Sequence, residues 1–389
     1  MESLQTAGVE EGDHLTVVAQ QPKVAATGAA FAVWFCGGDR IVTWGDPVCD
    51  SFVIQDYLKN VQQVQATTRA FAAILANGSV VTWGLALYGG ESSAVQDQLR
   101  NVRRIEATRS AFAAILFDES LVTWGDKFAG GDSFAVQHQL RNVKHVQATS
   151  CAFAAILADG SVVTWGDPEC GGDSSAVQDQ LRNVQQIYAA SGAFAAMLAS
   201  GSVVTWGDPR NGGDNSAVQD QLKNVQQIQS TNGAFAAILD DGSVVTWGDR
   251  CYGGDSSAVQ HRLRNVKHIQ TTSFAFAAIL ADGSVITWGD ALFGGQSFTV
   301  QRQLKLVTKI AATASAFAAL LEDGSVVTWG DPKHGGESSA VQHQLENVCE
   351  VEATDGAFLA LSRNGSVVTW GHLLWGGDSS AVQQSLQYL

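Results

Sequence analysis

The sequence predicts an all-β protein: a β-propeller-like array of nine three-stranded units of 41 residues, with an open superhelix of the same units as the alternative. The tripeptide Thr-Trp-Gly recurs nine times, first at an interval of 39 residues and then always at 41. A fixed period of about 20–50 residues is typical of propellers, solenoids and arrays. The nine tryptophans are Trp44, Trp83, Trp124, Trp165, Trp206, Trp247, Trp288, Trp329 and Trp370.

The fourth unit shows why three strands are expected in each repeat. A short strand begins at Val143, and the runs 152–157 and 161–165 consist of apolar or β-branched residues, which favour strands. Between these runs, Asp159-Gly160 predicts a hairpin with a type I′ turn, in which both central residues need positive φ. The unit is therefore an antiparallel meander, and its large apolar side chains, the tryptophan included, must pack against the next unit.

The segment that joins one unit to the next admits two interpretations. Val177, Leu181 and Val184 have the i, i+4, i+7 spacing of a helix, and Ser174 is a residue type that caps helices. We expect a short helix or helical turn here, and the preceding Gly-Gly-Asp-Ser-Ser is interpreted as a capping turn. A fourth, outer strand is the alternative, because strand alternation would place Val177 and Leu181 on one face.

The repeats run without a linker, so length does not imply several domains. We expect an N-terminal segment at residues 1–22 and a single repeat domain of nine blades at residues 23–389. Hydrophobic residues make up 46% of the chain, which is typical of a folded protein and argues against disorder.

Charge and hydropathy exclude several classes of partner. The net charge of −15 without any basic stripe makes binding to nucleic acid phosphates or to an anionic membrane unlikely. No apolar stretch is long enough for a transmembrane helix, and the N-terminus lacks the pattern of a signal peptide. The six cysteines form no regular framework, so free thiols are expected. Together these features predict a soluble protein of the cytoplasm or nucleus.

No motif in the chain predicts catalysis, a cofactor or a metal. The histidines lack the spacing of zinc ligands, and the Gly-Gly loops lack the lysine of a phosphate-binding loop. Gly-Asp-Ser recurs in several units, whereas a serine nucleophile needs one activating base beside it. We therefore assign no catalytic, cofactor-binding or metal-binding residue, and we expect that the protein is not an enzyme.

The repeat Ala-Phe-Ala-Ala-Ile-Leu-x-Asp-Gly-Ser-Val-Val-Thr-Trp-Gly, followed by a glycine-containing loop, resembles that of the regulator of chromosome condensation family. Its length is closer to the three-stranded blades of the β-lactamase inhibitor protein II type in the same superfamily. The resemblance covers the chain from Lys23 onward and implies a propeller fold and binding of protein partners. Relatives usually close with seven blades, and Gly-Gly-Asp-Ser-Ser here replaces their Gln-Leu-Gly. The family's founding activity, nucleotide exchange on a small nuclear GTPase, uses projecting segments that these uniform units lack, so it is not carried over.

The nine units differ from one another mainly in two short stretches, one before the Ala-Phe strand and one before Gly-Gly. In a three-stranded meander, the loops after the first and third strands emerge at the same end, so this variation maps to one loop face. Aromatic residues and arginine are enriched in binding hot spots. We predict a partner-binding face that comprises Arg69, Tyr88, Arg109, Phe128, Arg210, Asn211, Tyr252, Phe274, Phe293, Lys333, His334 and Trp375.

These observations favour a non-enzymatic protein-protein interaction module, a scaffold or adaptor that binds a protein partner through the loop face. Three alternatives remain: an inhibitor or regulator of an enzyme or small GTPase, a structural spacer, and an enzyme with an unrecognised central pocket. The sequence names neither the partner nor the closure of the ring.

Overall fold

A computed structural model describes residues 23–27, 30–34, 38 and 40–379 of the chain. Its strands form nine separate three-stranded sheets, each in the order of the chain. The pairing within each sheet is antiparallel, as in β10–β11 and β11–β12. The predicted all-β class and the nine three-stranded units are thereby confirmed. The predicted N-terminal segment, 1–22, lies outside the described residues.

The strands have nearly constant lengths from unit to unit. The first strands are β1 (Lys23–Ala26), β4 (Val61–Ala66), β7 (Val102–Ala107), β10 (Val143–Ala148), β13 (Val184–Ala189), β16 (Val225–Ser230), β19 (Val266–Thr271), β22 (Val307–Ala312) and β25 (Val348–Ala353). The second strands are β2 (Ala30–Trp34), β5 (Ala70–Leu75), β8 (Ala111–Leu116), β11 (Ala152–Leu157), β14 (Ala193–Leu198), β17 (Ala234–Leu239), β20 (Ala275–Leu280), β23 (Ala316–Leu321) and β26 (Ala357–Ser362). The third strands are β3 (Ile41–Gly45), β6 (Val80–Gly84), β9 (Leu121–Gly125), β12 (Val162–Gly166), β15 (Val203–Gly207), β18 (Val244–Gly248), β21 (Val285–Gly289), β24 (Val326–Gly330) and β27 (Val367–Gly371).

Short 3-10 helices follow the third strands: η2 (Pro47–Cys49), η4 (Ala86–Tyr88), η5 (Lys127–Ala129), η6 (Pro168–Cys170), η8 (Pro209–Asn211), η10 (Arg250–Tyr252), η12 (Ala291–Phe293), η13 (Pro332–His334) and η15 (Leu373–Trp375). Others lie in the segments that cross to the next unit: η3 (Phe52–Tyr57), η7 (Gln178–Gln180), η9 (Gln219–Gln221), η11 (Gln260–Arg262) and η14 (Gln342–Gln344). In the described part of the chain, no helix has the length and apolar character needed to span a membrane.

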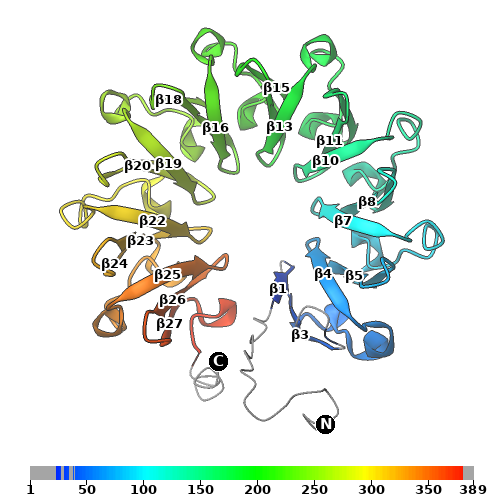
Figure 1. Ribbon diagram of the computed structural model, residues 1–389, viewed down its shortest axis with the longest axis horizontal. Helices are drawn as coiled ribbons and strands as arrows, with labels where there is room; N and C mark the ends of the chain where they lie inside the picture. The colour runs from blue at the N-terminus through cyan, green and yellow to red at the C-terminus, as the bar shows by residue number, and fades with distance from the viewer. Residues whose placement is uncertain (1–22, 28–29, 35–37, 39, 380–389) are drawn as a thin grey trace, which may run out of the picture.

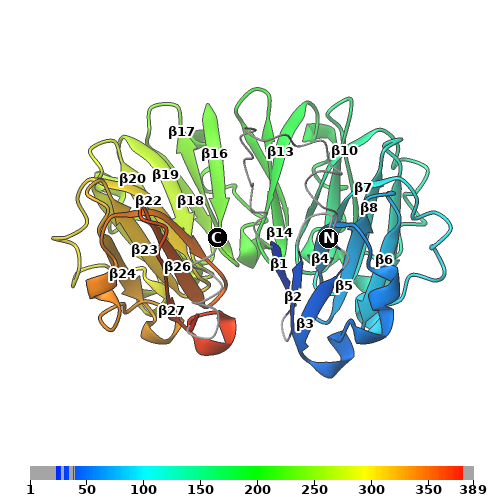
Figure 2. The same ribbon diagram turned by 60° about the horizontal axis from the view of Figure 1, so that its bottom comes forward.

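The units follow one another around a central opening, with the first strands nearest the centre and the third strands further out (Figure 1). Eight hydrophobic clusters each join two consecutive units. Among the described residues no such cluster joins the ninth unit to the first, and Figure 2 shows the opening between them at the front of the tilted ring. The described units therefore form an open ring.

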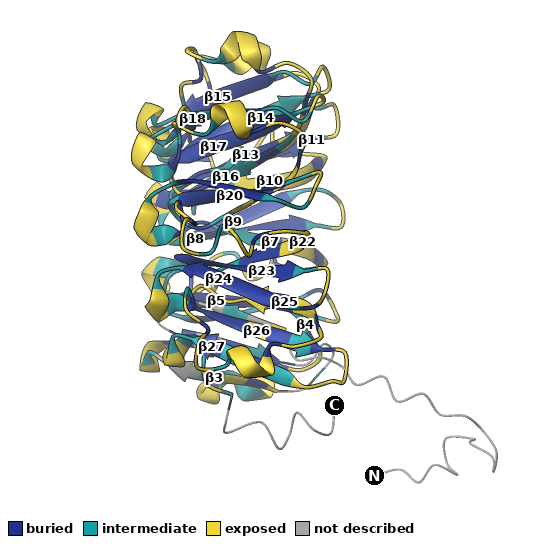
Figure 3. Cartoon of the chain, turned by 90° about the vertical axis from the view of Figure 1, so that its left-hand side faces the viewer, coloured by how far each residue is buried: buried dark blue, intermediate teal, exposed yellow. Residues whose placement is uncertain are grey.

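Each unit presents one apolar face to the preceding unit and another to the following unit. In the fourth unit, Phe153 and Trp165 pack against the third unit, whereas Ala154 and Ile156 pack against the fifth. Phe153 and Trp165 lie opposite each other in register, and their rings stack with centroids 5.3 Å apart. The predicted placement of the tryptophan between neighbours is confirmed. In an edge view, the buried strands run through the middle of the ring while the exposed helical turns lie at its rim (Figure 3).

The hairpin between the second and third strands is confirmed, but the predicted type I′ turn is wrong. In the fourth unit, Leu157 N donates to Ser161 O at 2.9 Å and Gly160 N donates to Leu157 O at 2.9 Å. Gly160 has φ of 77°, whereas Asp159 is not among the residues with positive φ. The loop therefore has three residues and ends in a left-handed glycine, a common alternative to the two-residue turn. Asp159 instead accepts a hydrogen bond from Ser161 N at 2.9 Å.

The segment that crosses to the next unit forms helical turns, as expected, and no strand forms in its described copies. The predicted capping role of Ser174 is wrong. Its hydroxyl lies 3.0 Å from that of Thr164 and donates to Gln178 Oε1 at 2.8 Å, while Gln178 Nε2 donates to Val162 O. The serine thus ties the crossing segment to the third strand, because these polar groups are buried and need partners.

The ninth unit shows what an uncovered face looks like. A Cβ built on Gly335 in the eighth unit would lie 2.5 Å from the Phe358 ring of the ninth unit. A Cβ on Gly376, the same position one repeat later, would meet no atom within 4 Å among the described residues. Leu359 is likewise exposed at a position where Ala318 of the eighth unit is fully buried. Among the described residues, none therefore packs on the final face as the next unit packs on each earlier one.

Candidate partner-binding face

The loops after the first and third strands meet at one end of each unit, as the sequence predicts. In the third unit, Asp126 N donates to Ser110 O at 2.9 Å, and the hydroxyl of Thr108 donates to Ala129 O at 3.0 Å. The turn between the second and third strands lies at the other end, where Val102 N donates to Gly78 O. We call these two ends the loop face and the turn face.

A chain of backbone hydrogen bonds runs around the centre of the loop face. From the second unit to the eighth, the residue that follows Thr67 or its equivalent donates its N–H to the carbonyl of the equivalent residue one repeat later. The seven bonds measure 2.8–3.0 Å and link Thr68, Arg109, Ser150, Ser191, Asn232, Ser273, Ala314 and Asp355 in that order. Seven such bonds hold the inner loops of neighbouring units at fixed spacing, so the inner edge of this face has a preset shape.

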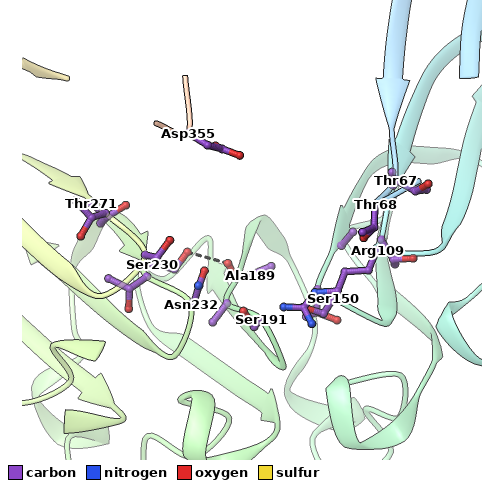
Figure 4. Close-up of a pocket in the computed structure, with 18 of the residues that line it drawn as sticks. Thr67, Thr68, Arg109, Ser150, Ala189, Ser191, Ser230, Asn232, Thr271 and Asp355 are labelled. Carbon is purple, nitrogen blue, oxygen red and sulfur yellow. Dashed lines mark hydrogen bonds between the residues drawn. The ribbon is translucent and has the colours of Figure 1, made fainter. Parts of the chain in front are cut away.

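The inner loops surround a pocket of about 540 Å³ at the centre of the loop face. Its lining comes from eight of the nine units, from Thr27 in the first to Asp355 in the ninth, and consists mainly of threonine, serine and alanine. Figure 4 shows the polar side chains directed into this space from around the ring. Because no single unit supplies more than a few of these residues, the pocket exists only in the assembled ring.

Two charged residues stand in this otherwise uncharged pocket. Arg109 is exposed on one side of it and Asp355 enters from another (Figure 4). Desolvation by the surrounding protein raises the pKa of Asp355. The two charges give the pocket a positive and a negative side, so a bound group would be held in a defined direction.

A second layer of contacts lies outside the inner loops. Here the residue just before the second strand touches the last residue of the 3-10 helix. Phe274 stacks on Tyr252 of the preceding unit with ring centroids 4.4 Å apart. Its ring is tilted against that of Phe293 in its own unit, with centroids 4.2 Å apart. All three rings are partly exposed. The structure therefore brings these three predicted site residues into one aromatic cluster.

Arg69 makes a contact between the first two units. Its guanidinium forms an ion pair with Asp46 of the first unit, and its Nε donates to Asp46 Oδ2 at 3.2 Å. The hydrogen bond from Arg69 lowers the pKa of Asp46, and the same bond raises that of Arg69. Arg69 thus links the first two units, and its guanidinium is engaged by Asp46 while part of the side chain stays exposed.

Tyr88 and Asn211 are also partly buried in contacts within the loop face. Tyr88 packs against the cluster between the second and third units, and its carbonyl accepts a hydrogen bond from Thr67 at 2.9 Å. Asn211 Nδ2 donates to Asp208 Oδ2 at 2.7 Å and lies beside Gly192. Both side chains support the loops and leave only an edge exposed.

His334 and Trp375 belong to a group near the open end of the ring. His334 Nδ1 lies 2.5 Å from Asp331 Oδ2, and the ring of His334 stacks on that of His372 at 5.7 Å. The ring of His372 in turn meets that of Trp375 edge-on at 6.5 Å. Burial opposes ionisation of Asp331, but hydrogen bonds from His334 and the Lys333 backbone lower its pKa.

Four predicted residues are well exposed: Arg109 in the central pocket, and Phe128, Arg210 and Lys333 on the 3-10 helices further out. Phe128 is 72% exposed, with the ammonium group of Lys127 above its ring at 4.8 Å from the centroid. The twelve residues lie at the predicted end of the ring but are spread over several units, so they do not form a single compact patch.

Sequence reasoning missed several residues of this face. Asp355 and Asn232 line the pocket, and their signal was their place in the variable stretch, which was noted without assigning them a role. Leu292 is 75% exposed beside the aromatic cluster. It also missed that exposed aromatic residues are not confined to the loop face, because Phe134 and Phe298 in the crossing segments are 88% and 79% exposed. Exposed aromatic residues alone therefore do not single out one face. What distinguishes the loop face is a pocket lined by residues of eight units.

No family model matches this chain, and no curated protein matches it in sequence. Solved structures do match. Prp20p of Saccharomyces cerevisiae, reported with its binding to Gsp1p and histones, is 17% identical over 71% of this chain and 72% of its own, with a TM-score of 0.39. Human WBSCR16 is 15% identical over 89% and 88%, with a TM-score of 0.38. The C-terminal domain of gp131 from bacteriophage phiKZ is 11% identical over 92% of both chains, with a TM-score of 0.38.

Yeast RCC1, which is Prp20, belongs to the family that the repeat resembles, so a protein of the expected kind is among the matches. All of these TM-scores are below 0.5 and the identities are low. None of the activities of these proteins is therefore carried over to this chain.

Proposed function

We propose that this chain is a non-enzymatic interaction module of the cytoplasm or nucleus that binds a protein partner through its loop face. The central pocket carries this proposal. It is assembled from eight units, lies on a backbone fixed by seven hydrogen bonds between units, and contains one positive and one negative side chain. A surface that is ordered before binding loses less conformational entropy when a partner arrives.

The chemistry around the pocket indicates what such a partner presents. A protruding polar loop fits the hydroxyl-lined centre, with an acidic group toward Arg109 and a basic group toward Asp355. Apolar side chains of the partner would meet Phe128, Leu292 and the aromatic cluster, which are residue types found at the energetic centres of interfaces. Regulation of an enzyme or a small GTPase would be a specific form of the same interaction.

The composition of the pocket supports a role without catalysis. Its lining includes a single carboxylate and neither histidine nor cysteine. The hydroxyl groups that line it therefore have no histidine among the lining residues to act as the base that most often activates a serine. Binding needs only the shape and the polarity that the pocket supplies.

Photo-crosslinking from the pocket followed by charge reversal tests this proposal. A photoreactive residue in place of Ser191 would identify the partner, and its affinity for purified variants would then be measured. We expect Arg109→Glu and Asp355→Lys each to weaken binding at least about tenfold, equivalent to about 1.4 kcal/mol. Arg264→Glu, an exposed position in a crossing segment on the turn face, is the matched control and should change little. Equal losses for Arg109→Glu and Arg264→Glu would mean that the pocket is not the contact site.

A further inference from the structure

We propose that Cys151 and Cys170 form a dithiol site on the loop face that closes reversibly to a disulfide. This site is independent of the partner-binding function and would operate whether or not a partner is bound. Both residues are free cysteines with partial exposure. Cys151 lies just before β11, and Cys170 ends η6 in the same unit.

Hydrogen bonds hold the two backbones close together. Asp167 N, at the start of the loop that leads to Cys170, donates to Cys151 O at 3.0 Å. The hydroxyl of Thr149, two residues before Cys151, donates to Cys170 O at 3.0 Å. The same threonine also receives a hydrogen bond from Ala152 N. These bonds fix both cysteines on adjoining loops.

The same two positions are in contact in other units, and these contacts indicate how close the two Cβ atoms lie. In the seventh unit they are Phe274 and Phe293, whose rings are tilted against each other with centroids 4.2 Å apart. In the ninth unit a Cβ built on Gly356 lies 3.2 Å from the Cβ of Trp375. Disulfides join Cβ atoms about 3.5–4.5 Å apart, so a small adjustment of a few tenths of an ångström suffices.

The residues at these two positions vary from unit to unit. A glycine faces the bulky ring in two cases, Gly233 against Tyr252 and Gly356 against Trp375. Among the eight later units, only the fourth has cysteine at both positions. The fourth unit thus places its two thiols at a contact that the fold makes repeatedly.

The environment of the two thiols sets the order of reaction. Burial, with the neighbouring Cys151 and Asp167, raises the pKa of Cys170 to about 12. The thiolate is the nucleophile in thiol–disulfide exchange, so Cys151 reacts first. With oxidised glutathione as the oxidant, the Cys151 thiolate attacks one sulfur, forms a mixed disulfide and releases one glutathione thiolate.

Closure of the protein disulfide completes the exchange. Cys170 gives its proton to a released glutathione thiolate and attacks the Cys151 sulfur, which forms the Cys151–Cys170 bond and breaks the mixed disulfide. The second glutathione then leaves. Two protein thiols are oxidised while one molecule of oxidised glutathione is reduced to two thiols.

The test equilibrates the full-length protein with glutathione buffers of graded redox ratio, alkylates the remaining thiols and identifies linked peptides by mass spectrometry. We expect a Cys151–Cys170 linked peptide in the wild type. Cys170→Ser should instead retain glutathione on Cys151, since the resolving thiol is missing. Cys251, exposed at a position without a cysteine opposite, serves as an internal reference for ordinary thiol reactivity.

A cysteine pair introduced in another unit tests the proposal even if the Cys170→Ser variant does not fold. Ser110→Cys with Ala129→Cys places thiols at the same two positions of the third unit, in a background of Cys151→Ser and Cys170→Ser, and should give the equivalent linked peptide. Circular dichroism verifies that each variant folds. The proposal is overturned if the wild type keeps both thiols reduced, or carries persistent glutathione on Cys151, under conditions in which Cys251 is fully modified.

Discussion

The indole Nε1 of Trp165 donates a hydrogen bond of 3.0 Å to the carbonyl of Gly130 in the preceding unit. This bond recurs at every described tryptophan side chain of the repeat, at 3.0–3.1 Å. The pairs are Trp83–Cys49, Trp124–Gly89, Trp206–Gly171, Trp247–Gly212, Trp288–Gly253, Trp329–Gly294 and Trp370–Gly335. Because an unpaired buried polar group is costly, each bond fixes the orientation of one unit on the next.

Removing one of these bonds should weaken the ring. Trp206→Phe leaves the Gly171 carbonyl without its donor and opens space beside Phe194, so we expect a loss of about 2–3 kcal/mol in the free energy of unfolding. Urea denaturation followed by circular dichroism measures it. Phe134→Leu, at an exposed position, is the control and should change stability by less than about 0.5 kcal/mol. Similar effects from the two substitutions would refute the structural role of the indole N–H.

Leu306 occupies a backbone position that favours asparagine. Its φ is 52°, and the equivalent residue in other units is an asparagine such as Asn265, at 54°. The left-handed region costs most residues about 1 kcal/mol or more, whereas asparagine tolerates it. Leu306→Asn should therefore stabilise the protein by about 1 kcal/mol, and the reverse change Asn265→Leu should destabilise it by a similar amount. Thermal unfolding of both variants checks the sign, and a loss of stability in Leu306→Asn contradicts the account.

The open end of the ring can be detected with two equivalent glycines. Both Gly335 and Gly376 have positive φ, at 93° and 96°, so alanine is strained at either position. Only at Gly335 would the new methyl group also collide with Phe358. Gly335→Ala should therefore cost about 1–3 kcal/mol more than Gly376→Ala, the typical cost of overpacking. Equal losses would show that the ninth unit is covered in solution.

We expect low pH to reduce the folding stability of the protein, because aspartates in the hairpin turns of the turn face become protonated. A serine two residues later donates hydrogen bonds to each carboxylate, the stronger effect coming from its hydroxyl and the next from its backbone N–H. These bonds lower the pKa of Asp118, Asp159, Asp241, Asp282 and Asp323 from the ordinary value. A carboxyl whose pKa is lower in the folded state stabilises that state above the unfolded pKa. This stabilisation is lost as the pH falls through the folded value, here below about pH 4.

Replacing these five aspartates by asparagine should reduce the loss of folding stability at low pH. Asn77 and Asn364 already make the same contacts with Ser79 and Ser366, which shows that a residue without charge fits the turn. Stability would be measured by urea unfolding between about pH 5 and pH 2.5. Burial raises the pKa of Asp355 and of Glu106, so these two groups act in the opposite direction, against the five aspartates. A variant that loses stability in acid as steeply as the wild type would contradict this prediction.

The period and the apolar patterns were sufficient to predict the units, because both strands of a hairpin and the residues that pack between neighbours are close in sequence. They were also sufficient to place the variable loops at one end. The turn type was not predictable in the same way. Asp-Gly is compatible with both a two-residue and a three-residue loop. In the three-residue loop of the structure, Asp159 accepts hydrogen bonds from the backbone N–H and the hydroxyl of Ser161.

Features that depend on contacts between units could not be predicted from the sequence. The inner hydrogen-bond chain joins residues 41 positions apart through backbone groups, which carry no sequence signal. The pairing of Arg69 with Asp46 depends on how the first unit packs on the second. Eight interfaces between consecutive units together place the ninth unit relative to the first, so no single repeat carries the information on ring closure.

The most direct test of the loop-face account compares three baits in quantitative affinity capture: wild type, a loop-face variant (Phe128→Ser, Leu292→Ser, Lys333→Ser) and a turn-face variant (Phe134→Ser, Phe298→Ser). All three must first show the same circular dichroism. The account predicts a protein that is captured by the wild type and the turn-face variant and lost by the loop-face variant. Retention of that protein by the loop-face variant, or its loss from the turn-face variant alone, would contradict the account.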